Sequence, residues 1–218
     1  MKAVGYQPIN RRMLKKMDIT GIILAGGKSL RFGRNKALEK IAGMTLVERV
    51  ITRLTPITAR IVLITDGDNG RFSEIKSTET VTDIYPARGP LGGIYTGLSA
   101  SKTVANIVVA CDMPFLNTVL LSHMVDISAG FDAVIPHWPN NQIEPLHGIY
   151  SLSCIPVMKK RLENNQLAIS ECLKEMHVLY FDQTEFSKFD PEFLSFFNIN
   201  NKADIELLNK IEARQQIK

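Results

Sequence analysis

The sequence predicts an α/β fold, with one domain built on a doubly wound, mostly parallel sheet that carries helices on both faces. Short β-branched runs alternate with amphipathic stretches, and the runs are apolar throughout rather than at every second residue. Strands of this kind are buried on both faces, as in parallel sheets covered by helices. Because crossovers between parallel strands are right-handed, such a chain winds into a doubly wound layer.

The elements follow one another in a regular order. The first expected strand is 19–24 (ITGIIL), which leads into a glycine loop. A helix is expected over 44–54, because its apolar residues recur at helical spacing and share one face: Leu46, Val47, Val50, Ile51 and Leu54. The runs 61–65 (IVLIT) and 80–83 predict two further short strands.

The next part of the chain keeps this alternation. The helix expected over 91–101 follows a Gly-Pro pair, and 106–111 (NIVVAC) is again an apolar strand. Asn117 is a favourable N-cap for a helix that runs to about Ser128. A further strand is expected over 132–135.

The pattern changes after Pro136, where 137–144 is polar and rich in turn residues. Strands at 146–151 and 178–181 and helices at 155–162, 169–175 and 202–211 complete the expected elements. No repeat or low-complexity linker divides the chain, so we expect one domain over 18–218. Residues 1–17 are basic but lack the apolar stretch of a secretory signal, and we expect a disordered or non-native extension there.

Composition narrows the class of protein. The 218 residues are 45% hydrophobic and 22% charged, and no apolar run approaches the roughly 20 residues needed to span a bilayer. A net charge of +4 is too small to indicate a nucleic-acid partner. Cys111, Cys154 and Cys172 are far apart and lack metal-ligand spacing, which predicts free thiols in a reducing compartment. We therefore expect a cytoplasmic protein with neither a membrane nor a nucleic-acid partner.

The first chemical motif is LAGGKSLRFGRNK, residues 24–36, directly after the first strand. The paired glycines Gly26 and Gly27 let the backbone approach a ligand closely, and successive N–H groups there can form an anion-binding nest. Arg31 and Lys36 add positive charge where a triphosphate would lie. The motif is neither a Walker A loop nor a Rossmann G-x-G-x-x-G. It predicts a phosphate-binding turn.

Two acidic residues also come at strand ends. Asp112 directly follows the apolar strand 106–111, the position where an open α/β sheet places ligand-binding residues. A hard carboxylate there suits Mg²⁺, which takes one or two carboxylates together with substrate phosphates. Asp83 ends the strand 80–83 and precedes a glycine-rich helix entry that contains Gly89, Pro90, Gly92 and Gly93.

These motifs resemble those of the molybdenum cofactor guanylyltransferase family, whose loop commonly reads L-A-G-G-x-S-x-R-M-G-x-x-K. This chain departs only at Phe32. The related cytidylyltransferases tend to have L-A-A-G, so Gly26-Gly27 favours the guanine branch. The family's G-P-L-x-G and D-x-P motifs match Gly89 to Gly93 and Asp112 to Pro114. The resemblance implies the Rossmann-like nucleotidyltransferase fold.

The resemblance also implies site residues. Three would be catalytic: Arg31, Lys36 and Asp112, with Asp112 as the Mg²⁺ ligand. The implied nucleotide-binding residues are Leu24, Ala25, Gly26, Gly27, Lys36, Thr65, Asp83, Gly89, Pro90, Gly92 and Asp112. At Thr65 the family often has an Asn that contacts the nucleoside, and a threonine hydroxyl has a shorter reach.

On the acceptor side, Glu144-Pro145 matches a segment that borders the acceptor pocket in the family, and Asn200 is a weaker match. Trp138 is interpreted either as a stacking surface for a pterin or as a loop anchor. A histidine such as His147, in a loop or edge strand, is more often structural than catalytic.

The implied reaction transfers GMP from GTP to the phosphate of molybdopterin, forms the guanine dinucleotide cofactor and releases pyrophosphate. Transient contacts with cofactor-delivery and acceptor proteins are also expected. Two alternatives stay open: a sister enzyme that uses CTP or a sugar-phosphate acceptor, and a catalytically silent nucleotide-binding protein.

Overall fold

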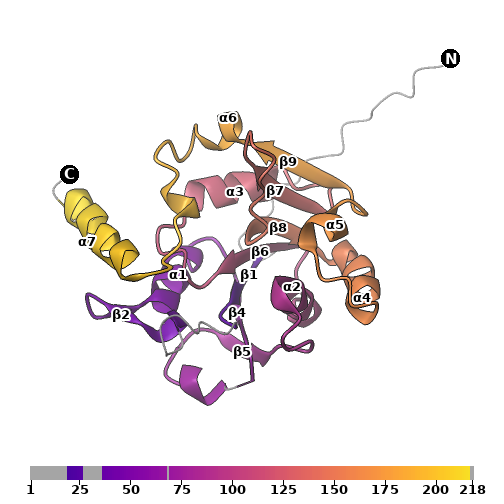
Figure 1. The fold of residues 1–218 in the computed structure, drawn as a ribbon, viewed down its shortest axis with the longest axis horizontal. Helices are drawn as coiled ribbons and strands as arrows, with labels where there is room; N and C mark the ends of the chain where they lie inside the picture. Colours follow the sequence, from indigo (N-terminus) through magenta and orange to yellow (C-terminus); the bar gives the residue numbers. More distant parts are fainter. Residues whose placement is uncertain (1–18, 27–35, 68, 217–218) are drawn as a thin grey trace.

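The computed structural model describes residues 19–26, 36–67 and 69–216, and within them the chain folds around a seven-stranded sheet (Figure 1). The strand order is β5-β4-β1-β6-β8-β7-β9. The strands are β1 Ile19–Leu24, β4 Arg60–Thr65, β5 Glu79–Thr82, β6 Ala105–Ala110, β7 Ala133–His137, β8 His147–Ser151 and β9 Val178–Asp182. A two-stranded sheet pairs β2 Lys40–Ile41 with β3 Met44–Thr45.

The sheet is mostly parallel, as predicted. β5, β4, β1 and β6 pair in parallel, and β7 pairs with β9 in parallel. β8 is the exception, because it runs antiparallel to both β6 and β7. From β1 the chain proceeds outward to β4 and β5, and then returns to β6 on the other side of β1. The carboxyl ends of β1 and β6 therefore form a topological switch point, the place where open α/β sheets bind ligands.

Helices cover both faces of the sheet (Figure 1). One face packs against α1 and α3, and the other packs against α2, α4 and α5. Side chains of β1 point alternately to the two faces: Ile23 packs on the face covered by α1 and α3, and Ile22 packs on the face covered by α2, α4 and α5. The helices are α1 Leu46–Leu54, α2 Gly89–Ala100, α3 Thr118–Asp126, α4 Ile155–Glu163, α5 Ile169–Leu173, α6 Gln183–Phe186 and α7 Lys202–Gln216.

The start of α1 differs from the sequence prediction by two residues. Met44 and Thr45 belong to β3, and Thr45 is the N-cap. The Thr45 hydroxyl accepts the Glu48 N–H at 3.2 Å, and the Glu48 carboxylate accepts the Thr45 N–H at 2.8 Å. This reciprocal capping box satisfies two backbone donors and fixes the first turn of the helix. Asn117 caps α3 as predicted.

Glycines bring α2 close to the central strand. A Cβ added at Gly97 would lie 2.3 Å from Ile22 Cγ2, closer than real contacts allow. Gly93 is also packed on β1, because its Cβ would lie 3.1 Å from Leu24 Cδ2. The absence of side chains at these two positions sets the distance between α2 and β1.

Replacing Gly97 by alanine is therefore expected to lower the free energy of unfolding by about 1–3 kcal/mol, because the added methyl overpacks the interface with Ile22. Urea denaturation followed by circular dichroism measures the change. Ser99→Ala, at an exposed position of the same helix, is the control and should leave stability nearly unchanged. Equal stabilities for wild type and Gly97→Ala would contradict the close packing.

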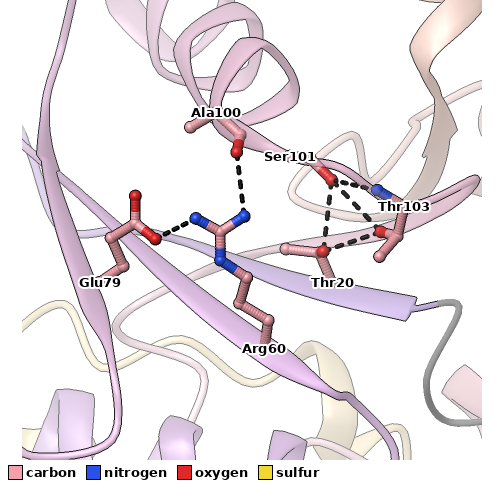
Figure 2. A network of polar contacts seen from close by, with 6 residues as sticks. All are labelled: Thr20, Arg60, Glu79, Ala100, Ser101 and Thr103. Atoms are coloured by element: carbon pink, nitrogen blue, oxygen red, sulfur yellow. Dashed lines mark hydrogen bonds and ion pairs between the residues drawn. The ribbon is translucent and has the colours of Figure 1, made fainter.

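A polar network fixes the end of α2 at the amino-terminal edge of the sheet (Figure 2). The Arg60 guanidinium lies between Glu79, with which it forms an ion pair, and the Ala100 carbonyl, which accepts from it at 3.2 Å. Beside it, the buried Thr20 hydroxyl accepts from Thr103 Oγ1 at 2.7 Å and from Ser101 Oγ at 3.2 Å. These contacts hold the connection between α2 and β6.

The carboxyl-terminal segment packs against the edge of the molecule near α1 (Figure 1). Leu208 of α7 is buried with Leu46, Phe115 and Ile199. An ion pair between Arg49 and Glu212 joins α1 to α7. No helix in the described part of the chain is long and apolar enough to cross a membrane.

Candidate active site

The candidate site lies at the switch point. Cys111, which follows β6, donates its N–H to the Leu24 carbonyl at 3.1 Å, so the ends of β1 and β6 are joined directly. Ala25 donates to the Ile64 carbonyl at 2.8 Å, which links β1 to β4. The side chain of Leu24 packs into the core against Gly93, and only its backbone can meet a ligand. Gly27 and Arg31, predicted as site residues, lie outside the described residues.

The structure brings Lys36, Asp112 and Asn200 together. Lys36 Nζ lies 2.7 Å from Asp112 Oδ2 and donates to Asn200 Oδ1 at 3.1 Å. The side chains of Lys36 and Asp112 are only 10% and 19% exposed, so water screens this ion pair weakly. Lys36 and Asp112 were predicted from the sequence as members of one site, and their contact spans 76 residues of chain.

The donor set at Asp112 fits a hard divalent cation. Asp112 Oδ1 is buried and lacks a hydrogen-bond partner among the described residues. A buried carboxylate oxygen without a partner is costly, and a cation would satisfy it. No group of three or more metal-ligating side chains occurs in the described part of the chain. One carboxylate nevertheless suffices for Mg²⁺ when substrate phosphates and water complete its shell.

Asp83 holds a turn against α2. Its Oδ1 accepts the Tyr85 N–H at 3.0 Å and the Thr96 hydroxyl at 2.7 Å, and Thr96 Oγ1 in turn accepts the Ile84 N–H at 3.0 Å. A Cβ at Gly92 would lie 2.8 Å from the Tyr85 carbonyl oxygen and 3.3 Å from Asp83 Oδ2. Only glycine therefore lets the turn and the helix meet in this way.

The other two predicted residues of this loop, Gly89 and Pro90, lie at the start of α2. Gly89 has φ of 65°, in the left-handed region that favours glycine. Pro90 occupies the first turn of α2, where a missing N–H costs nothing. Both residues thus shape the loop that leads from the Asp83 turn into the helix.

Thr65 is placed differently from the sequence expectation. Its side chain is fully buried, and its hydroxyl donates to Asn69 Oδ1. Asn69 Nδ2 donates to Thr82 Oγ1 at 3.0 Å, so the Asn69 carboxamide is held by two hydroxyls above the ends of β4 and β5. Asn69 is an exposed polar group at this place, and the sequence pattern gave no signal for it because it follows the strand by several residues.

Trp138 and Glu144 lie in the loop that joins β7 to β8, on the other side of β1 and β6 from β4 and β5. Trp138 Nε1 donates to Glu144 Oε1 at 2.9 Å, and the indole makes edge-on contacts with three aromatic rings: Phe186, Phe193 and Phe196. These contacts favour the loop-anchor interpretation of Trp138 over stacking on a ligand. Burial raises the pKa of Glu144, against the hydrogen bonds from Trp138 and Gln142 that lower it.

His147 lies in the sheet interior rather than in a loop or an edge strand. It begins β8, is fully buried and shares a hydrogen bond of 2.6 Å between Nε2 and Ser195 Oγ. Ser195 Oγ also accepts the Asn117 N–H at 2.9 Å, and Asp190 accepts the Ser195 N–H at 2.8 Å. Burial lowers the pKa of His147 to about 4. This network joins the carboxyl-terminal segment to the sheet, and its role is structural, as the sequence indicated.

Because the folded-state pKa of His147 is about 4 and the ordinary value is 6.5, the unfolded chain binds a proton first as pH falls. We expect its contribution to stability to be complete above about pH 6.5 and to be lost between there and about pH 4, a change of at most about 3 kcal/mol.

The measurement is the free energy of unfolding against pH for wild type and His147→Gln. Raised pKa values of Glu144 and Asp190, both caused first by burial, act in the opposite direction and are present in both proteins. The wild-type curve should fall more steeply between pH 6.5 and 4. Parallel curves would contradict a neutral, buried His147.

The fold and the switch-point cluster fit a nucleotidyltransferase. The family model of the MobA-like NTP transferase domain matches residues 21–177, and the chain belongs to this family. A probable molybdenum cofactor guanylyltransferase of Methanosarcina mazei is 32% identical over 88% of this chain and 90% of its own length. A second probable molybdenum cofactor guanylyltransferase, from Carboxydothermus hydrogenoformans, is 33% identical over 89% of this chain and 96% of its own length. The predicted family is thus confirmed.

A solved structure supports the predicted fold class. The crystal structure of molybdopterin-guanine dinucleotide biosynthesis protein A from Archaeoglobus fulgidus matches with a TM-score of 0.78 and 27% identity. The match covers 89% of this chain and 99% of that one. The predicted α/β fold is therefore confirmed at the level of both topology and family.

Proposed function

We propose that this chain transfers GMP from GTP to the phosphate of molybdopterin, forming the guanine dinucleotide cofactor and releasing pyrophosphate. The names of its relatives support the choice of substrates. The observation that carries the proposal is the meeting of Lys36 and Asp112, 2.7 Å apart, at the switch point of the sheet. One residue supplies positive charge for phosphates and the other a hard carboxylate for a cation.

In the proposed reaction a phosphate oxygen of the acceptor attacks the α-phosphorus of GTP in line. The new phosphorus–oxygen bond forms as the bond to the bridging oxygen of the leaving pyrophosphate breaks, so no covalent enzyme intermediate is needed. In the proposal, Lys36 and Arg31 bind the phosphates. Backbone N–H groups of Gly26 and Gly27 hold the nucleotide in the proposal. The Ala25 N–H, expected from the sequence to take part, is instead bound to the Ile64 carbonyl. The protein acts by positioning and by charge stabilisation.

Asp112 is the residue that would hold Mg²⁺. When bound, Mg²⁺ neutralises charge on the α-phosphate and the leaving pyrophosphate. The unpartnered Asp112 Oδ1 supports this assignment. Lys36 supplies positive charge beside Asp112 at the end of β6, whereas the groups at the ends of β4 and β5, Asn69 and Asp83, are uncharged or acidic. The phosphates therefore belong near Lys36, and the nucleoside belongs over β4 and β5.

The remaining parts of the proposal concern the acceptor and the setting. Glu144 lies in the loop between β7 and β8, on the other side of β1 and β6 from β4 and β5, and we assign it to the acceptor side. We place the enzyme in the cytoplasm, with GTP and molybdopterin as its small-molecule partners and transient contacts to proteins that deliver and collect the cofactor. No nucleic acid or membrane has a part in it.

Pyrophosphate release by purified protein with Mg²⁺ and molybdopterin tests the proposal, with GTP, CTP and ATP compared in parallel. Release with GTP alone is the expected result. Release with CTP instead would assign the chain to a sister activity. GTP binding without release over molybdopterin and sugar-phosphate acceptors would favour a catalytically silent protein.

A further inference from the structure

The ammonium of Lys36 is bound in the free protein by the kinds of atoms that a hard cation prefers. Its neighbours are a carboxylate oxygen of Asp112 at 2.7 Å and an amide oxygen of Asn200 at 3.1 Å. Carboxylate and amide carbonyl oxygens are common protein ligands of hard divalent cations. The lysine therefore lies against the carboxylate to which the proposed function assigns Mg²⁺.

We infer that Lys36 neutralises Asp112 in the free protein and that a divalent cation binds there tightly only once the ammonium has left the carboxylate. This inference rests on the proposed function for the identity of the cation. A single carboxylate offers one negative charge, and the Lys36 and Asp112 side chains are 10% and 19% exposed. Two cations on one weakly screened carboxylate repel each other strongly, so each weakens the binding of the other until further negative charge arrives.

A nucleotide triphosphate would supply that charge. The lysine side chain has a flexible four-carbon stem, so its ammonium can move from Asp112 to a phosphate while the backbone stays in place. Asp112 would then be available to the cation through both oxygens, including the buried Oδ1 that lacks a partner among the described residues. Free protein should bind the cation weakly, and nucleotide should strengthen that binding. By linkage, the cation should strengthen nucleotide binding by the same factor.

Mn²⁺ binding to the free protein, followed by electron paramagnetic resonance at neutral pH without nucleotide, is the direct test. Lys36→Met is expected to bind Mn²⁺ at least about tenfold more tightly than wild type, because the competing ammonium is gone. Lys40→Met is the matched control, since it removes the same charge from an exposed position on the following strand and should behave like wild type. The double variant Lys36→Met/Asp112→Asn should lose the gain.

A second readout covers the case in which Lys36→Met folds poorly. Without its lysine, Asp112 keeps an unpaired and mostly buried charge, so the variant should melt at a lower temperature than wild type. Mg²⁺ should then raise the Tm of Lys36→Met and leave that of wild type nearly unchanged, since a ligand stabilises the state that binds it. The shift in Tm can be measured whether or not the variant is enzymatically active.

The inference is overturned if Lys36→Met binds Mn²⁺ no more tightly than wild type, or if the gain survives Asp112→Asn. Turnover of the wild type separates this result from a failure of the proposed function. GTP-dependent pyrophosphate release by wild type, with no gain in Lys36→Met, would refute the inference alone. A gain in Lys36→Met, with no release by wild type from any nucleotide, would refute the proposed function alone.

Discussion

Replacing Asp112 by asparagine is expected to lower kcat for pyrophosphate release by about a hundred- to a thousandfold. Asparagine keeps the size of the side chain and one acceptor oxygen, so the local fold should survive. It removes the negative charge that pairs with Lys36 at 2.7 Å and that would hold the cation. Loss of charge stabilisation at a transferring phosphoryl group costs several kcal/mol of transition-state energy.

Steady-state kinetics at saturating GTP and Mg²⁺ measures this loss. Asp126→Asn, which changes an exposed carboxylate at the end of α3, is the matched control and should keep wild-type activity. Circular dichroism checks that both variants are folded. An Asp112→Asn enzyme within threefold of wild type would show that the carboxylate is not part of the chemistry.

Gly92→Ala is expected to reduce kcat/KM for GTP by about a hundredfold, mainly through a higher KM. The added methyl would lie 2.8 Å from the Tyr85 carbonyl oxygen and 3.3 Å from Asp83 Oδ2, and a backbone oxygen cannot swing aside as a side chain can. The turn from Asp83 to Tyr85 must therefore shift away from α2. Misplacement of a binding group by about 1 Å is enough for an effect of this size.

The matched comparison is Gly97→Ala, five residues further along the same helix. That variant should lose stability through its contact with Ile22 but keep the wild-type KM for GTP at temperatures where it is folded. Gly92→Ala should instead change the KM for GTP more than the free energy of unfolding. An unchanged KM in Gly92→Ala would remove the Asp83 turn from the nucleotide site.

The central strands were predictable because a continuous run of apolar residues indicates a strand that is buried on both faces. Continuous apolar runs located β1, β4 and β6, helical spacing located α1, and the Gly89-Pro90 pair marked the start of α2. The β2–β3 hairpin was missed, because two-residue strands carry no period and its turn places Ala42, which is not glycine, at φ of 50°. The reversed direction of β8 was also missed, since an apolar run does not encode the direction of its pairing.

The candidate site was predictable to the extent that its residues follow strands. Lys36 and Asp112 were placed in one site because the carboxyl ends of neighbouring parallel strands meet. Asn200 could be assigned only weakly, since it reaches Lys36 across 164 residues through the packing of the carboxyl-terminal segment. Asn69 and Ser195 carried no signal, because their partners are set by loop conformation and not by periodicity.

The chain has a single tryptophan, and Trp138 is fixed at one known place. Its indole is held by Glu144 and enclosed by Phe186, Phe193 and Phe196, at the side of the site region assigned to the acceptor. The tryptophan fluorescence of the whole protein therefore originates from this cluster. Excitation at the red edge of the indole band gives an optical reporter of the acceptor side that needs no label, and its emission can be followed during a titration or a single turnover.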